Sequence, residues 1–138
     1  MNRKPKSNSY VQPMPRKQFL RLMHEFKEIG GKYICNKETE EFLSLQKAEA
    51  MTIDGFTILF SRRPSRAAVY EELFHAKQFR NGKINGSFEN MLTCEVEAQE
   101  YLLNNAKLLE LTDPEIIQTR QALEWYRQKL TELKGEEI

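Results

Sequence analysis

Residues 71–78, Glu-Glu-Leu-Phe-His-Ala-Lys-Gln, form the stretch that most limits how this chain can fold. Ser65 supplies a helix start, and the small and apolar residues after it recur at helical spacing, so the stretch is predicted to be helical. At about 100° per residue, Glu71 and His75 share one face of that helix, and Glu72 lies beside His75. The opposite face is apolar and must be buried. The fold therefore has to hold these ionisable side chains close to its core.

Glu71 and His75 have the spacing of two metal ligands one turn apart on a zinc-protease helix. In that arrangement the residue after the first ligand is the general base, a role that falls to Glu72 here. The usual His-Glu-x-x-His pattern differs at one position, because a carboxylate occupies the first ligand place. The alternative is a surface helix on which such a row of charges contributes only about 0.2 to 0.5 kcal/mol.

A third carboxylate, Glu95, lies on the next predicted helix. The apolar residues of that helix gather in one stripe with Glu95 at its centre and Gln99 beside it, whereas Glu97 points the other way. A carboxylate in a buried stripe must be paired, protonated or bound to a metal. The alternative to a metal is a salt bridge to an arginine such as Arg62 or Arg66.

These observations predict a metal site with Glu71, His75 and Glu95 as ligands. Zn is the expected ion, although two carboxylates and one imidazole also suit Mn or Fe. Glu72 is the expected catalytic base. Two further polar residues are expected to orient the ligands from behind: Gln78 and Gln99.

Composition places the chain among soluble globular proteins. With 138 residues and a formal net charge of +1, it is expected to be one domain without the basic surface of a nucleic-acid binder. The sequence has no apolar run of membrane-spanning length and no signal-peptide segment. The expected location is the cytoplasm, unless a longer protein carries the chain elsewhere, and the oligomeric state is left open.

The order of local patterns predicts an α+β fold. Residues 1–15 hold three prolines among basic and polar residues and are predicted to be a disordered tail or linker. Residues 16–138 are predicted to be a single, mostly helical domain, in which an antiparallel β-hairpin with an Asp54-Gly55 turn precedes the metal-site helix. Helices are expected over 16–29, after Asn36, from Ser65 to about residue 80, over 87–109 and from Thr112 onward.

A resemblance to a known family is visible in two strings, residues 65–78 (Ser-Arg-Ala-Ala-Val-Tyr-Glu-Glu-Leu-Phe-His-Ala-Lys-Gln) and 95–102 (Glu-Val-Glu-Ala-Gln-Glu-Tyr-Leu). These strings and the order of elements resemble the zincin-like metallopeptidase domains at the C-terminal ends of bacterial polymorphic toxins. In gluzincins the third ligand precedes an Ala by three positions, and Glu95 fits that pattern. This chain departs from the family at Glu71, where most zincins have His, and at Gln99, where an Asp would orient an imidazole.

The resemblance implies a zinc-dependent peptidase that acts as a toxin effector on a peptide or protein substrate. It also implies a cognate immunity protein as partner, and secretion or delivery to a target cell if the chain is part of a longer toxin. Two other functions stay open. One is a non-enzymatic interaction domain with a zincin fold, which Glu71 in place of His favours. The other is a carboxylate-bridged iron protein, because Glu72-x-x-His75 is the unit of such sites, which would need a dimer to be complete.

Overall fold

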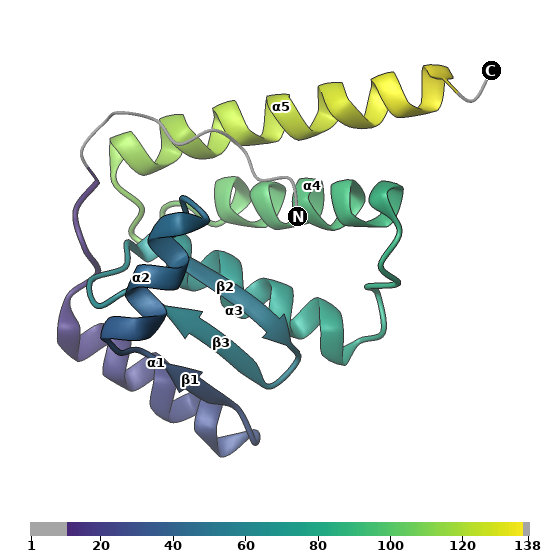
Figure 1. The fold of residues 1–138 in the computed structure, drawn as a ribbon. Coiled ribbons are helices and arrows are strands. Elements are labelled where there is room, and N and C mark those ends of the chain that lie inside the picture. Colours follow the sequence, from purple (N-terminus) through teal and green to yellow (C-terminus); the bar gives the residue numbers. More distant parts are fainter. Residues whose placement is uncertain (1–10, 137–138) are drawn as a thin grey trace.

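The computed structural model of the chain describes residues 11–136 and has an α+β fold, with helices packed around a small sheet (Figure 1). Strands β2 (Ala50–Asp54) and β3 (Thr57–Phe60) form the predicted antiparallel hairpin, but the turn lies at Gly55-Phe56, one residue later than predicted, because Asp54 still pairs with Thr57. Strand β1 (Lys32–Ile34) pairs with β3 in parallel and gives the strand order β1-β3-β2. The sheet as a whole is therefore mixed rather than antiparallel.

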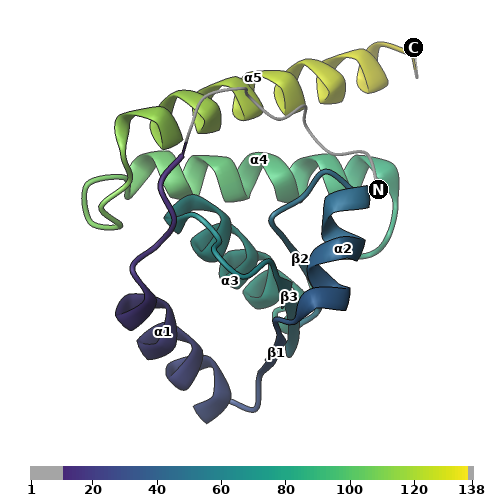
Figure 2. The same cartoon turned by 60° about the vertical axis from the view of Figure 1, so that its left-hand side comes forward.

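The sheet lies between α2 (Lys37–Leu45) on one face and α1 (Arg16–Glu28) and α3 (Arg66–Arg80) on the other (Figure 2). Helices α1 and α3 bury apolar residues against the sheet, whereas α2 buries Leu43 but leaves Phe42 and Leu45 exposed. Asn36 caps α2 by accepting a hydrogen bond from the Thr39 N–H at 2.8 Å. The core between α1, α3 and the sheet contains Phe19, Met23, Phe26, Ala50, Ile58, Phe60, Val69 and Ala76.

Helix α4 (Phe88–Asn104) lies against α3, and α5 (Asp113–Glu136) runs along α4 (Figure 1). The predicted end of α4 near residue 109 is wrong. The chain leaves the helix after Asn104 and makes a series of turns in which Glu110 adopts a positive φ of 56°. None of the helices in residues 11–136 has the length and apolar character that a membrane span requires.

The N-terminus of α3 is held from two directions. The Ser65 side chain accepts a hydrogen bond from the Ala68 N–H at 3.2 Å, as a helix cap does. Glu115, at the start of α5 and 1% exposed, accepts a hydrogen bond from the Ala67 N–H at 2.6 Å through Oε2. Its Oε1 accepts from the Thr112 N–H at 3.0 Å, and together with the Glu115 N–H, which donates to the Thr112 hydroxyl at 3.4 Å, this forms a capping box at the predicted start of α5. One buried carboxylate thus caps two helices.

The segment before α1 is ordered over residues 11–15, so the prediction of a disordered tail is wrong for these residues. The Met14 N–H donates to the Pro64 carbonyl at 2.8 Å, Pro13 forms a β-bridge with Ser65, and the Met14 side chain is 6% exposed. Composition fails here because one buried methionine and a short backbone pairing are enough to anchor an arm. The same prediction for residues 1–10 lies outside the described part of the chain.

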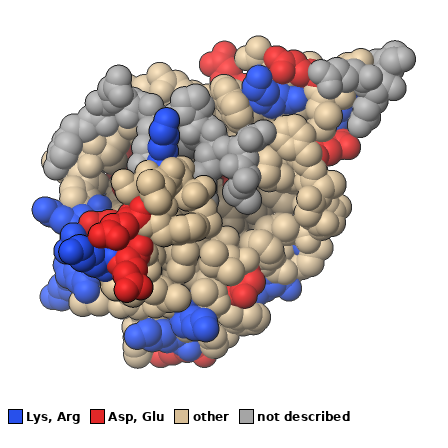
Figure 3. Space-filling model, viewed as in Figure 1, with Lys and Arg blue, Asp and Glu red and all other residues tan. Residues whose placement is uncertain are grey.

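Charged side chains of both signs lie next to one another on the face shown in Figure 3. Among the described ion pairs, Arg62 binds Glu40 at 2.9 Å and His24 binds Glu28 at 3.0 Å. Such exposed pairs contribute little to stability, about 0 to 1 kcal/mol each. They are best understood as the solvated surface of the domain.

Replacing Glu115 by Ala should lower the free energy of unfolding by about 2 to 4 kcal/mol, because buried N–H groups of two helices lose a charged acceptor. Urea unfolding followed by circular dichroism measures the loss. Glu124→Ala, on the exposed side of the same helix, is the matched control and should change stability by less than about 0.5 kcal/mol. Equal effects of the two substitutions would contradict the capping role of Glu115.

Candidate metal centre

Four buried ionisable residues meet where α3 faces α4. Glu71, Glu72 and His75 come from α3, and Glu95 comes from α4. Helix α3 presents the first three on one side because its opposite side, which includes Val69, packs against the sheet. Helix α4 contributes Glu95 from its apolar stripe, as its helical spacing predicts.

The His75 ring is the centre of this cluster. Its Nε2 lies 2.6 Å from Glu95 Oε1 and 3.9 Å from Glu71 Oε2. Potential ligand atoms of Glu71, Glu72 and His75 all lie within 4.8 Å of one another. The structure thus places the two predicted carboxylate ligands, Glu71 and Glu95, next to the imidazole of the third, His75. It also brings Glu72, the predicted base, within reach as a further ligand.

Gln78 fixes the orientation of the His75 ring. The Gln78 amide NH₂ donates to the main-chain carbonyl of Cys94 at 3.0 Å, so its oxygen must face the ring, where Oε1 lies 2.7 Å from His75 Nδ1. Nδ1 therefore carries a proton. With Nδ1 bound to Gln78, the other ring nitrogen, Nε2, faces the carboxylates of Glu95 and Glu71. Gln78 occupies the supporting position that the sequence predicts.

A positive charge is required between Nε2 and the carboxylates. Nε2 is buried and has no hydrogen-bond partner among the residues described, despite its short distance to Glu95. A neutral ring would point its lone pair at negative oxygens, which is repulsive. Burial disfavours the charged imidazole, but Glu95, Glu72 and Glu71 outweigh it and raise the pKa of His75 to about 10. Either a proton or a metal ion can supply the charge.

Gln99 contacts Glu71 rather than an imidazole. Its amide NH₂ donates to Glu71 Oε1 at 3.0 Å, and the Gln99 side chain is fully buried. In the zincin pattern that the sequence resembles, an Asp at this place accepts a hydrogen bond from a His ligand. Here an amide donor faces a carboxylate ligand, so the two departures from the pattern, Glu71 and Gln99, are chemically complementary.

Glu72 is held by the neighbouring strand. The Thr52 N–H donates to Glu72 Oε1 at 2.9 Å, and the Thr52 hydroxyl lies 3.0 Å from the same oxygen. The hydroxyl is also 2.9 Å from the Glu72 main-chain carbonyl. These contacts fix the carboxylate at the edge of β2. The sequence analysis missed Thr52, because a threonine in a strand is common and carries no motif.

A pocket of about 300 Å³ opens beside the cluster. Glu72, His75 and Glu95 line it, so these side chains are accessible to a small molecule or a peptide segment. Glu71 is not part of the lining and lies behind the ring with Gln99. The remaining walls come from Thr52, Phe79, Ile84, Gly86, Asn90, Met91 and Cys94.

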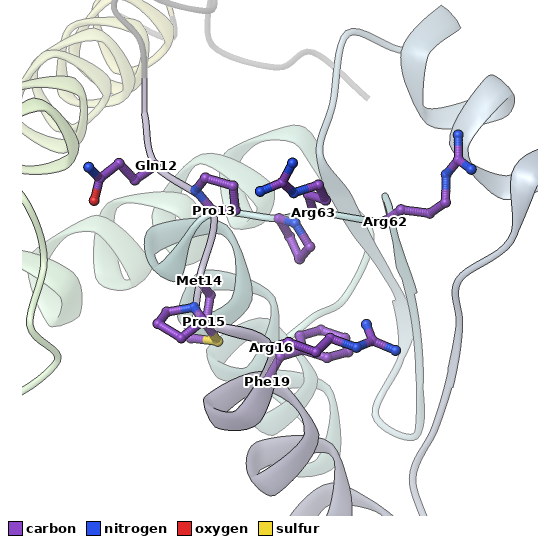
Figure 4. A pocket seen from close by; sticks show the side chains of 9 residues that line it. Gln12, Pro13, Met14, Pro15, Arg16, Phe19, Arg62 and Arg63 are labelled. Carbon is purple, nitrogen blue, oxygen red and sulfur yellow. The ribbon is translucent and has the colours of Figure 1, made fainter.

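A second pocket, of about 360 Å³, is formed by the arm before α1 and the loop before α3 (Figure 4). Arg16 and Arg63 lie on its walls, and Arg62 extends away toward α2, where it binds Glu40 at 2.9 Å. The described residues of its lining include no carboxylate, histidine, cysteine or hydroxyl group. It therefore offers no acid, base or nucleophile for a reaction.

The two arginines considered as salt-bridge partners of Glu95, Arg62 and Arg66, bind other residues in the described part of the chain. Arg62 binds Glu40, and Arg66 lies 3.3 Å from Gln18 and 3.9 Å from Glu110. Glu95 instead lies 2.6 Å from His75 Nε2. The buried carboxylate thus contributes to the cluster instead of being neutralised elsewhere.

The donor set fits a divalent metal ion. Carboxylates and imidazole are ligands of Zn, Mn and Fe, and ligand atoms of Glu71, Glu72 and His75 form one group, with Glu95 Oε1 2.6 Å from His75 Nε2. Comparison with protein-family models, with curated protein sequences and with solved structures finds no match for this chain. The functional interpretation therefore depends on the chemistry of the cluster itself.

Glu95→Ala should abolish binding of added Zn, because it removes the carboxylate nearest to Nε2. Glu97→Ala, two residues away on the exposed side of α4 where it pairs with Lys83 at 3.5 Å, should leave binding and stability almost unchanged. A metal titration and a thermal melt on both variants measure this. If Glu97→Ala were the damaging change, the assignment of the third ligand would be wrong.

The metal-free protein should lose stability as the pH rises from about 7 to 10. The pKa of His75 is raised from its ordinary value of 6.5 to about 10 in the folded state, so its contribution is fully present below pH 6.5 and is lost as the pH passes about 10. Urea unfolding in the presence of a chelator measures the slope. His75→Gln should remove this part of the slope, whereas His24→Gln, at an exposed histidine, should retain it.

Proposed function

We propose that this protein is a metal-dependent peptidase, with the ion held by Glu71, His75 and Glu95. The observation that carries the proposal is the buried Nε2 of His75, which faces carboxylates and requires a cation in a pocket open to a substrate. Zn is the ion that fits the family resemblance, and Mn or Fe also suits the oxygen-rich ligand set.

The residues of the site have distinct tasks. His75 offers Nε2 because Gln78 holds the proton on Nδ1, and Glu71 is oriented by the Gln99 amide. A divalent ion bound here supplies Lewis acidity, which polarises a substrate carbonyl and lowers the pKa of a water molecule. The protein supplies a largely buried donor set, in which the 2.6 Å contact between His75 Nε2 and Glu95 Oε1 would open to admit an ion.

Glu72 is placed to accept the proton of the attacking water. Thr52 fixes one oxygen of its carboxylate, and Glu72 lines the same pocket as His75 and Glu95. A general base must be within hydrogen-bond reach of the proton that it takes, and position is the first requirement. The proton accepted by Glu72 is then available for the leaving amine of the cleaved peptide.

The biological role follows the family resemblance. A toxin effector that cleaves a peptide or protein of a target cell, and that is neutralised by an immunity protein, is consistent with a small domain bearing one site. Secretion or delivery would be a property of a longer protein that includes this chain.

A second candidate is a non-enzymatic domain in which the cluster is purely structural. The 2.6 Å contact between His75 Nε2 and Glu95 Oε1 favours it, because a proton alone can supply the charge in a short ion pair. The iron-protein alternative has less support. The chain has two histidines, and the other, His24, is exposed and paired with Glu28, so one chain lacks a second Glu-x-x-His unit.

Metal analysis of protein purified without a chelating column separates these candidates: one Zn, Mn or Fe per chain supports the peptidase, and no metal supports the structural cluster.

Glu72→Gln should keep the ion and the fold but lose hydrolysis of a denatured protein substrate by about 10²-fold or more, because the amide cannot accept a proton. Glu89→Gln, at an exposed position of α4, is the control and should remain active.

Loss of metal in Glu72→Gln to the same degree as in Glu71→Gln would mean that Glu72 is a ligand. The roles of the two neighbouring glutamates would then be exchanged. Such a result is chemically reasonable, because both carboxylates lie within 4.8 Å of the His75 ring nitrogen that completes their group.

A further inference from the structure

The pocket beside the cluster has an apolar wall that the proposed chemistry does not use. Phe79 lies one turn after His75 on α3, and Met91 lies one turn before Glu95 on α4. Ile84, in the loop between the helices, completes the wall. Because residues four apart share a helix face, the wall continues the two faces that carry the cluster.

The loop that carries Ile84 is fixed by hydrogen bonds. The Asn90 amide NH₂ donates to the Lys83 carbonyl at 2.7 Å, and the Asn90 amide oxygen accepts from the Asn85 N–H at 2.8 Å. These two bonds bracket Ile84 on both sides. The Cys94 thiol also lies 3.8 Å from the Lys83 carbonyl. The apolar wall is therefore formed before any ligand arrives.

The chemistry of the lining divides the pocket in two. Its charged residues are Glu72, His75 and Glu95, which belong to the cluster, and its apolar side chains lie together beyond them. A volume of about 300 Å³ is at the small end of ligand sites, which span roughly 300 to 1,000 Å³. The apolar part thus has room for a large side chain but not for a folded partner.

We propose that this wall, formed by Phe79, Ile84 and Met91, binds a bulky apolar side chain of the substrate next to the bond that is cleaved. The inference rests on the proposed function, because it takes the scissile carbonyl to lie at the cluster. One helical turn spans about 5.4 Å and one residue of an extended peptide about 3.3 to 3.6 Å, so an adjoining side chain reaches the wall. Leucine, phenylalanine and methionine are the residues that fit.

Binding can be measured without catalysis, on the full chain. The probes are N-acetyl-leucine methylamide and N-acetyl-serine methylamide, titrated by ligand-observed NMR into chelator-treated and Zn-loaded protein. The leucyl probe should bind about tenfold more tightly than the seryl probe, because only its side chain gains from leaving water. Met91→Trp, which fills the pocket, and Ile84→Ser, which makes the wall polar, should each remove the preference.

Leu108→Trp places the same new side chain at an exposed position and should keep the preference. Equal binding of the two probes to the wild-type protein, or an unchanged preference in both pocket variants, would overturn the inference. Failure of the proposed function looks different: the protein would show the leucyl preference in chelator but bind no Zn. Protein that binds Zn and hydrolyses substrate without a leucyl preference would contradict the inference alone.

Discussion

The need for a positive charge among buried carboxylates governs this structure. Glu71, Glu72 and Glu95 lie around a single imidazole, and burial makes any unbalanced charge costly. Two glutamines hold the helices of the cluster together by connecting them in opposite directions: Gln78 of α3 binds the α4 backbone, and Gln99 of α4 binds Glu71 of α3. The spacing of the helices and the position of the ligands are therefore set by the same contacts.

Local patterns predict most of the elements but not how distant segments pair. Ser65 predicts the start of α3, and the Asp54-Gly55 pair predicts the hairpin. Both predictions succeed because a cap and a tight turn depend on neighbouring residues only. The parallel pairing of β1 with β3 could not be predicted, since three residues contain no information about their partner. The anchoring of Met14 and the early end of α4 likewise depend on contacts made far along the chain.

Helical geometry alone predicts which residues of α3 and which face of α4 contribute to the site. A rotation of about 100° per residue places Glu71 beside His75, and the apolar stripe of α4 distinguishes Glu95 from Glu97. What it cannot reveal are the bonds to main-chain groups, such as that of Gln78 to the Cys94 carbonyl, because these form only when α3 packs on α4. The complementary change of two partners, Glu71 with Gln99, is likewise visible only once their contact is known.

The helix that carries the cluster receives part of its N-terminal cap from much later in the chain. Ala67 and Glu115, which donate and accept that hydrogen bond, are 48 residues apart. As the protein emerges from a ribosome, α3 is exposed well before α5 exists, and its second cap is missing during that interval. The helix that carries the cluster thus gains this second cap only after Glu115 has been synthesised.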